Sequence, residues 1–263
     1  MDRNEAVLRE LNLYPLWQRR EVAVSAETQA EQAPVPAVAQ ASVAVAEPPP
    51  AEAVAEPVHA GGVLTEEGGG QSREQRITEL DWPELKTMVR DCTACKLRAG
   101  CTQTVFGVGD QQAGWLFVGE GPGADEDAQG EPFVGQAGKL LDNMLLSLGL
   151  TRGNDVYIAN IVKCRPPGNR TPEIDEIATC FPYLQRQISL INPKVIVALG
   201  KTAATALLGR EATLGSLRGA VHDFDGIPLI VTYHPAYLLR TPMDKAKAWQ
   251  DLCLARQTMR NAR

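Results

Sequence analysis

The sequence predicts an α/β domain in which a parallel β-sheet is covered by helices on both faces. Four apolar, β-branched runs have the length of buried strands, and they lie at residues 115–120, 156–164, 195–200 and 229–234. Helical patterns separate these runs and close the chain, at about 136–149, 173–190, 201–208 and 243–260. Regular alternation of strand and helix is typical of a parallel sheet with both faces covered.

The charge of the 263-residue chain is unevenly spread along its length. The net charge is −6, but residues 21–72 contain eight Glu and no Lys or Arg. The rest of the chain is therefore close to neutral. Because the acidity belongs to one segment, it does not exclude a nucleic-acid partner for the remainder.

The composition divides the chain into three parts. Residues 21–72 are rich in Ala, Val, Pro, Glu and Gly and contain no aromatic residue. Such a segment cannot bury enough surface to offset its chain entropy, so we expect a disordered linker. Residues 1–20 have the pattern of a short amphipathic helix ended by Pro15. This helix either docks on a protein partner or folds back on the domain. The third part, residues 73–263, is large enough for a core of its own.

Several expectations concern the cell compartment and the partners. The first residues lack a basic patch followed by an apolar core, and no run of about 18 apolar residues occurs. We therefore expect neither a secretory signal nor a membrane partner. Six cysteines without an export signal indicate a reducing compartment, where clustered thiols are metal ligands or reactive groups more often than disulfides. We expect a cytoplasmic monomer.

Polar residues stand at or just after the ends of the four predicted strands. They are Glu120, Asn160, Gly200 and His234. Ligands of open α/β sheets bind outside the carboxyl ends of the strands, so an acid, an amide and an imidazole should converge on one crevice. Such a crevice suits a ligand with both hydrogen-bond donors and acceptors.

Residues 119–124 formally match the dinucleotide fingerprint G-x-G-x-x-A after a strand. Pro122 interrupts the turn, the acids at 125–127 would repel a pyrophosphate, and no acid follows the second strand to bind a ribose. We reject a dinucleotide site and interpret the glycines as letting the backbone close over a planar ligand. Phe133, in the next turn-rich loop, either stacks on a flat ring or packs into the core.

The cysteines form a candidate metal site. Cys92 and Cys95 make a C-x-x-C motif, and 15 residues separate Cys164 from Cys180. The motif supplies two thiolates to one centre, and two distant cysteines complete four soft ligands for Zn²⁺ or an iron–sulfur cluster. Cys101 is an alternative ligand, and the spacing alone does not distinguish zinc from iron.

Two further segments suit contacts with nucleic acid. The Pro/Gly-rich loop at 163–172 carries three cations, Lys163, Arg165 and Arg170, beside the expected crevice, where cations suit phosphates. The segment that leaves the last strand begins with His234, whose place at a strand end favours a functional histidine. In the same segment, an apolar wedge of Leu238 and Leu239 suits insertion into a base stack.

Together, the segments GEGPGADEDAQGEPFVGQAGKLL, IANIVKCRPPGNRTP and HPAYLLR resemble the family 4 uracil-DNA glycosylases, the iron–sulfur type. The resemblance runs from about Ile77 to the C-terminus and leaves residues 1–72 outside. It implies a DNA-repair hydrolase that cleaves the N-glycosidic bond of deoxyuridine in single- or double-stranded DNA and leaves an abasic site for base excision repair. The implied fold is a three-layer α/β/α sandwich with a central, mainly parallel, four-stranded sheet.

By the same resemblance, three sets of residues take roles. The ligands of a [4Fe–4S] cluster would be Cys92, Cys95, Cys164 and Cys180. The uracil site would comprise Glu120, Gly121, Pro122, Phe133, Asn160 and His234. Contacts with DNA would come from Arg165, Arg170, Leu238 and Arg240.

Within that uracil site, Phe133 would stack on the ring, Asn160 would read its edge, and His234 would stabilise the departing uracil anion. Other branches of the superfamily carry an Asp as the water-activating base where this chain has Gly121. Glu120 is therefore left to position the water or to stabilise the sugar cation, and both roles stay open.

Three other functions are weighed against this one. A related branch binds uracil-DNA covalently through a His in an inserted basic loop, but residues 124–155 contain neither the insertion nor a His. A zinc-containing module could bind nucleic acid without catalysis. The third is a nucleotide-binding α/β enzyme, which the acids after Gly123 oppose.

Overall fold

The computed structural model describes residues 72–262. The helix expected in residues 1–20 and the expected linker, apart from Ser72, lie outside the described residues. Ser72 itself caps the first described helix, α2 (Arg73–Glu79), because its hydroxyl accepts a hydrogen bond from the Gln75 backbone N–H and its own N–H donates to the Gln75 side chain. Among the described residues, no helix has the length and apolar character needed to span a membrane.

One mixed sheet stands at the centre of the domain, with the strand order β1-β3-β2-β4-β6-β5. Its four central strands are mutually parallel and are the four predicted ones: β2 (Trp115–Gly119), β3 (Val156–Asn160), β4 (Val195–Leu199) and β6 (Ile227–Thr232). This arrangement confirms the predicted parallel sheet.

The expected number of strands is corrected from four to six within residues 72–262. The additional strands, β1 (Val108–Gly109) and β5 (Val221–Phe224), pair antiparallel at the two edges. Strand β1 has only two residues, and β5 is mostly exposed or half-buried. Neither strand therefore has the continuous apolar run by which a buried strand is recognised in a sequence.

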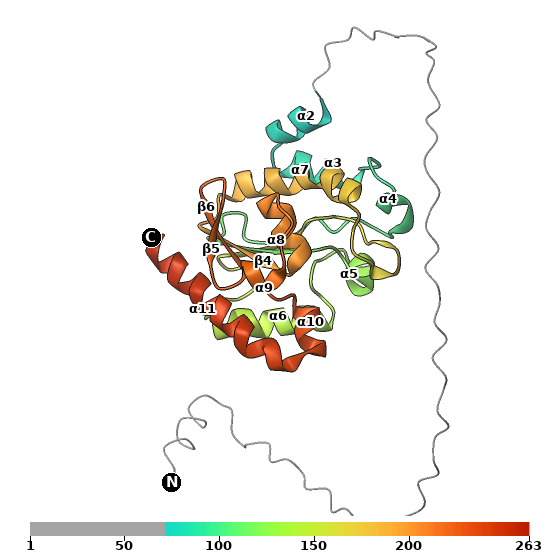
Figure 1. The fold of residues 1–263 in the computed structure, drawn as a ribbon. Coiled ribbons are helices and arrows are strands. Elements are labelled where there is room, and N and C mark those ends of the chain that lie inside the picture. Colours follow the sequence, from blue (N-terminus) through green and yellow to red (C-terminus); the bar gives the residue numbers. More distant parts are fainter. Residues whose placement is uncertain (1–71, 263) are drawn as a thin grey trace, which may run out of the picture. The chain divides into compact units, whose positions relative to one another are not determined.

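Helices cover both faces of the sheet, which gives the expected three-layer sandwich (Figure 1). One face is covered by α7 (Ile174–Ile191) and α8 (Lys201–Leu208), and α2 and α3 (Trp82–Arg90) pack on α7. The other face is covered by α6 (Gln136–Ser147) and α11 (Lys245–Asn261).

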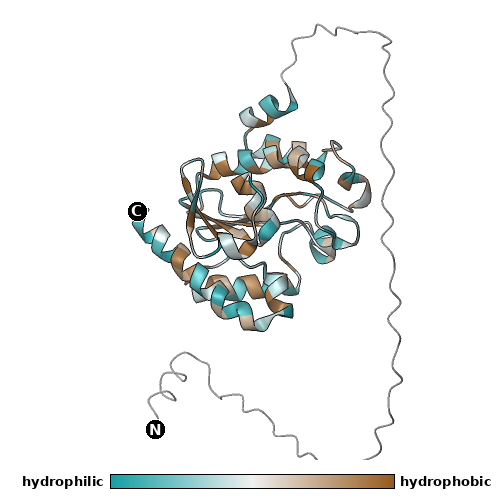
Figure 2. Cartoon of the chain, in the orientation of Figure 1, coloured by the Kyte–Doolittle hydropathy of each residue, from teal (hydrophilic) through white to brown (hydrophobic). Residues whose placement is uncertain are grey.

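Successive side chains along each central strand point to opposite faces of the sheet and so belong to two separate hydrophobic cores. In β2, Leu116 and Val118 belong to the core beneath α7 and α8, whereas Trp115 and Phe117 belong to the core beneath α6 and α11. Every residue of β2, β3 and β4 is buried. Figure 2 shows the consequence, because the central strands are hydrophobic and the helices mix hydrophobic with hydrophilic residues.

Several short helical elements lie in the connections between these strands and long helices. They are α4 (Leu97–Gly100), α5 (Ala124–Gln129), α9 (Leu214–Leu217), α10 (Pro235–Arg240) and the 3₁₀ turns Pro167–Asn169 and Pro242–Asp244. The segment that leaves the last predicted strand therefore forms a helix, α10. Pro235 occupies its first turn, where a proline is well tolerated.

Candidate active site

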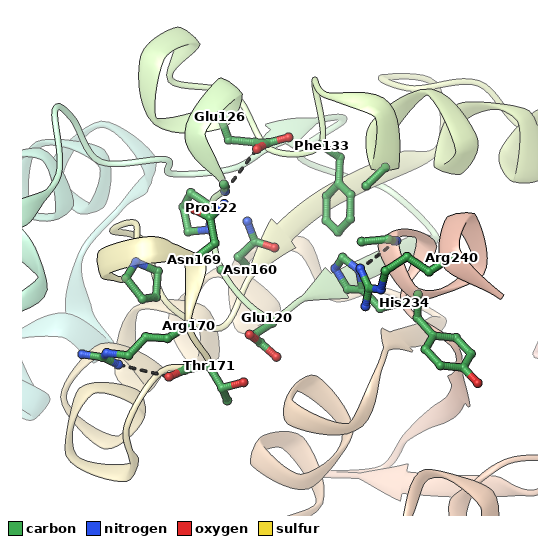
Figure 3. Close-up of a pocket in the computed structure, with 16 residues that line it drawn as sticks. Glu120, Pro122, Glu126, Phe133, Asn160, Asn169, Arg170, Thr171, His234 and Arg240 are labelled. Atoms are coloured by element: carbon green, nitrogen blue, oxygen red, sulfur yellow. Dashed lines mark hydrogen bonds between the residues drawn. The ribbon is translucent and has the colours of Figure 1, made fainter. Parts of the chain in front are cut away.

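The carboxyl ends of the parallel strands open into a pocket of about 470 Å³. All six residues expected at the uracil site line it: Glu120, Gly121, Pro122, Phe133, Asn160 and His234. Figure 3 shows the side chains of Phe133, Asn160, His234 and Glu120 directed toward a common space. The convergence predicted from the strand ends is therefore present, while the role of each residue stays a prediction.

Asn160 ends β3 with a buried carboxamide, only 2% exposed, whose Oδ1 has no hydrogen-bond partner. Its main-chain carbonyl accepts a hydrogen bond from the buried Lys163 Nζ at 2.9 Å. Gly119 makes room for the carboxamide, because a Cβ there would lie 2.4 Å from Asn160 Oδ1 and 2.5 Å from Cζ of Phe133. A buried acceptor without a partner is costly, so this amide is prepared for a ligand donor.

Phe133 packs into the core, which is one of the two alternatives drawn from the sequence, and its stacking on a flat ring stays a prediction. It is 5% exposed and belongs to the core beneath α6 and α11, yet it also lines the pocket. Its ring centroid lies 5.5 Å from that of His234, with 31° between the planes. The ring thus forms one wall of the pocket beside the imidazole.

His234 is the N-cap of α10, and this position fixes its tautomer. Its Nδ1 accepts a hydrogen bond from the Ala236 backbone N–H at 3.2 Å, so the neutral ring carries its proton on Nε2. Burial lowers the pKa of His234 to about 4, and the nearby Arg240 acts in the same direction. A neutral imidazole with one N–H donor therefore lines the pocket at neutral pH.

We expect the His234 imidazole to stay neutral as the pH falls from 7 to about 5, well below the pKa of an exposed histidine near 6.5. The unfolded chain would take up this proton below about 6.5 and the folded chain only near 4, so His234 favours the folded state less as the pH falls through that range. A ¹⁵N NMR titration checks this, with the signal assigned by its loss in His234→Asn. A midpoint above 6 would contradict the buried neutral ring.

Glu120 follows β2, and its carboxylate is held by a residue of helix α8. Its Oε2 accepts a hydrogen bond from the Thr202 hydroxyl of α8 at 2.6 Å. The neighbouring Gly121 cannot gain a side chain without movement, because a Cβ there would lie 2.8 Å from Cγ2 of Val162. Val162 thus crowds this position, and Glu120 is the carboxylate nearest to it in sequence.

The predicted phosphate-binding cations lie in different settings. Lys163 is buried, and its Nζ donates to the Asn160 carbonyl and to Gln187 Oε1, so its expected phosphate contact is contradicted. Arg240 is exposed and lines the pocket. Arg165 does not line it, and its Nε donates to Asn169 Oδ1 at 2.7 Å. Arg170 lines the pocket, but its guanidinium donates at 2.8 and 2.7 Å to the buried Glu176 of α7, which lowers the pKa of that carboxyl to about 2. Arg170 is therefore a paired group that fixes its loop, and its contact with phosphate stays a prediction.

The prediction of Leu238 as an intercalating wedge is contradicted. Leu238 is 1% exposed and lines an apolar cleft between α6 and α11, whereas Leu239 is 43% exposed. The physical reason is the helix α10, in which successive side chains point in different directions rather than toward a common face. Of the two leucines, Leu239 is the one that solvent reaches.

Comparisons with known proteins agree with this architecture. The sequence model of the uracil DNA glycosylase superfamily matches residues 106–253. A type-4 uracil-DNA glycosylase of Pyrobaculum aerophilum is 43% identical over 183 residues, which cover 66% of this chain and 93% of the relative. That of Thermotoga maritima is 49% identical over 154 residues, which cover 58% and 80%.

The chain belongs to the family 4 uracil-DNA glycosylases. This membership confirms the family resemblance carried by the three sequence segments, and with it the expected enzyme class. A type-5 uracil-DNA glycosylase of Pyrobaculum aerophilum is more distant, at 32% identity over 146 residues that cover 49% of this chain and 64% of the relative.

The four cysteines expected to ligate the cluster of this family 4 chain share one small cavity. Cys92 and Cys95 follow α3, Cys164 lies beyond β3, and Cys180 is on α7. All of them are free thiols, and Cys101 does not line the cavity. Within residues 72–262, no three His, Cys, Asp or Glu side chains are grouped so as to hold a single metal ion.

These thiols fit an iron–sulfur cluster in the chemistry of their donors, since four sulfurs from three segments surround one space. A four-iron cluster takes each thiolate on a different iron atom, so its ligands stand further apart than the ligands of a single zinc ion. The cavity shares no lining residue with the pocket at the strand ends. The two sites of this family 4 chain are therefore separate.

Three supporting residues were missed by the sequence reasoning. Thr202 holds Glu120, and Glu126 and Arg152 hold the loop of Phe133. Thr202 had a usable signal, because it comes two residues after Gly200, at the end of another predicted strand. Glu126 also had one, because it stands three residues after Gly123, the spacing of a helix-capping acid. Arg152 had none, since its partners in that loop are main-chain atoms about 20 residues away.

Proposed function

We propose that this chain hydrolyses the N-glycosidic bond of deoxyuridine in DNA, which releases uracil and leaves an abasic site for base excision repair. The observation that carries the proposal is the buried Asn160 carboxamide with its unpaired Oδ1. Such an amide accepts from uracil N3–H and donates to O4. Cytosine presents an acceptor at N3 and a donor at the exocyclic nitrogen, so the same amide in this orientation mismatches both.

The substrate base enters the pocket after leaving its stack, at a cost of a few kcal/mol. Phe133 then covers one face of the ring, and the pocket volume of about 470 Å³ is large enough to admit the base. Arg240 at the pocket and Arg165 in the neighbouring loop contact phosphates. Arg170 holds that loop through its pair with Glu176.

Cleavage of the bond places positive charge on the sugar and negative charge on the departing uracil. The Nε2–H of His234 faces O2 and stabilises that anion, a contribution of about 3–4 kcal/mol for one fixed donor in comparable sites. A neutral imidazole performs this task because its orientation is set in advance by the Ala236 N–H. Glu120, oriented by Thr202, positions the attacking water or stabilises the sugar cation.

We also propose that Cys92, Cys95, Cys164 and Cys180 hold a [4Fe–4S] cluster. When bound, this group supplies a cross-link between three segments of the chain rather than a reactant, since its cavity is separate from the base pocket. The assignment is supported by the four thiols around one space and by membership of family 4.

For the rest of the chain, we propose that residues 73–263 are the catalytic domain and act as a monomer on single- or double-stranded DNA. Residues 21–72 serve as a linker, and residues 1–20 dock on a protein partner. Support for this division comes from the family match within residues 106–253 and from the helix cap at Ser72. We propose that the enzyme acts in the cytoplasm, on the DNA that is its substrate.

The test is a visible absorption spectrum of the full chain purified without oxygen, followed by a uracil-containing oligonucleotide added to the same sample. We expect the broad visible band of an iron–sulfur cluster, and strand scission at uracil after alkali. An oligonucleotide with cytosine at the same position is the control and should stay intact. A colourless protein that releases uracil would contradict the proposed cluster. A coloured protein that binds the oligonucleotide without releasing uracil would contradict the proposed enzyme activity.

A further inference from the structure

The backbone of Phe133 is held in a conformation that a phenylalanine rarely adopts. Its φ is 56°, in the left-handed region that favours glycine. A residue stays in such a conformation only when the surrounding structure imposes it, and such residues gather at ligand sites. In Figure 3 the ring points from its loop into the pocket, so this backbone conformation serves to aim the ring.

Arg152 holds the carbonyl side of this loop. Its Nη1 donates to the Pro132 carbonyl and its Nη2 to the Phe133 carbonyl, both at 2.8 Å. The same guanidinium pairs with Asp142 of α6, with Nη2 to Oδ1 at 2.9 Å. The planar fork of arginine thereby fixes two consecutive carbonyls to the side of α6.

Glu126 holds the N–H side of the same loop. Its Oε1 accepts from the backbone N–H groups of Val134 at 2.9 Å and Gly135 at 3.1 Å. Its Oε2 accepts from the Gly123 N–H at 3.1 Å, and Gly123 belongs to the segment that also carries Glu120. One carboxylate therefore joins the loop of Phe133 to the opposite wall of the pocket.

The loop also lies directly on the first turn of α6. A Cβ at Gly138 would stand 1.7 Å from the Phe133 carbonyl oxygen, a contact between main-chain groups that no side-chain rotation can relieve. This close approach, the arginine fork and the carboxylate are three independent restraints on the loop of Phe133.

We propose that Arg152 and Glu126 are positioning residues that set the affinity for the extruded base by holding Phe133 over it. This inference deepens the proposed function, because it takes uracil as the ring that Phe133 covers. Arg152 acts through the Phe133 side chain and does not line the pocket. Its loss should therefore weaken binding of the base rather than the chemistry that follows.

The test is inhibition of glycosylase activity by free uracil, measured in a double-mutant cycle. Phe133→Ala should raise the inhibition constant about tenfold, because stacking of one base on an aromatic ring is worth this much or more. Arg152→Met should raise it several-fold with kcat nearly unchanged. In the Phe133→Ala background, Arg152→Met should have no further effect on uracil inhibition. Glu126 lines the pocket and also holds Gly123, so Glu126→Gln should raise the inhibition constant but keep part of this effect in the Phe133→Ala background.

Two controls separate positioning from general stability. Arg186→Met is matched, because Arg186 also donates to a main-chain carbonyl, that of Leu80 at 2.7 Å, but does not line the pocket. It should leave uracil inhibition unchanged. Arg152→Lys keeps the charge beside Asp142 and should recover part of the affinity. If Arg152→Met were to fold poorly, Arg152→Lys alone should still raise the inhibition constant for uracil, by a smaller factor. This rise should vanish in the Phe133→Ala background.

Equal effects of Arg152→Met with and without the Phe133 ring would overturn the positioning role, and so would an equal effect of Arg186→Met. The parent protein distinguishes this failure from failure of the proposed function. If the parent releases uracil and is inhibited by it while Arg152→Met behaves like the parent, only the positioning role fails. If the parent neither releases nor binds uracil, both proposals fail together.

Discussion

His234→Ala is expected to lower kcat about 10²–10³-fold while KM stays within a few-fold of the parent value, since this is the usual cost of removing one fixed donor at a developing anion. The Nε2–H is oriented before the reaction by the Ala236 N–H on the other ring nitrogen. Its interaction with uracil O2 strengthens as negative charge develops there, so the loss falls on the transition state. Single-turnover rates on a uracil-containing oligonucleotide measure the effect.

His222→Ala is the matched control for this variant. His222 is also partly buried, with its Nε2 2.7 Å from the Leu217 carbonyl oxygen, but it does not line the pocket. Its replacement should leave the single-turnover rate unchanged. An equal loss in both variants, or a rise in KM alone for His234→Ala, would show that His234 does not act on the departing base.

Glu120→Gln should lower kcat by about 10²-fold or more with little change in KM, within the range of acid–base and charge effects in active sites. Glutamine keeps the shape of the side chain and an oxygen that can accept from the Thr202 hydroxyl. The change therefore removes the negative charge without releasing the contact that orients it. Either role of Glu120, positioning water or stabilising the sugar cation, depends on that charge.

A surface carboxylate provides the comparison for Glu120. Glu211 is exposed and pairs with Lys201 at 3.2 Å, and it does not line the pocket. Glu211→Gln should keep the parental kcat and KM. For Glu120→Gln, a rise in KM with kcat preserved would assign this residue to substrate binding and remove it from the chemical step.

The central elements of the fold could be predicted because each is long and strongly patterned. Strands β2, β3 and β4 are buried throughout and read as continuous apolar runs. Helix α7 was expected at about 173–190 and spans Ile174–Ile191. The edge strand β1 could not be predicted, because its two residues pair with β3 through main-chain groups and carry no side-chain pattern.

In the candidate site, too, some residues could be predicted from the sequence and others could not. Asn160 and His234 could be predicted, because strand ends mark the ligand edge of a parallel sheet whatever the ligand is. The supports of the site depend on contacts between distant segments, such as Thr202 with Glu120, which are 82 positions apart. Leu238 was misplaced because six residues of α10 are too few for a helical period to be counted.

The pair of Arg170 with Glu176 has a consequence for the design of chimaeric repair enzymes. Grafting the loop that precedes α7 from a relative is an obvious route to a changed preference among DNA substrates. The buried Glu176 accepts from Arg170 and from the Glu173 N–H, so a graft that lacks this arginine would leave the carboxylate with the exposed Lys96, at 3.9 Å, as its remaining cation. The loop and the first turn of α7 should therefore be exchanged as one cassette.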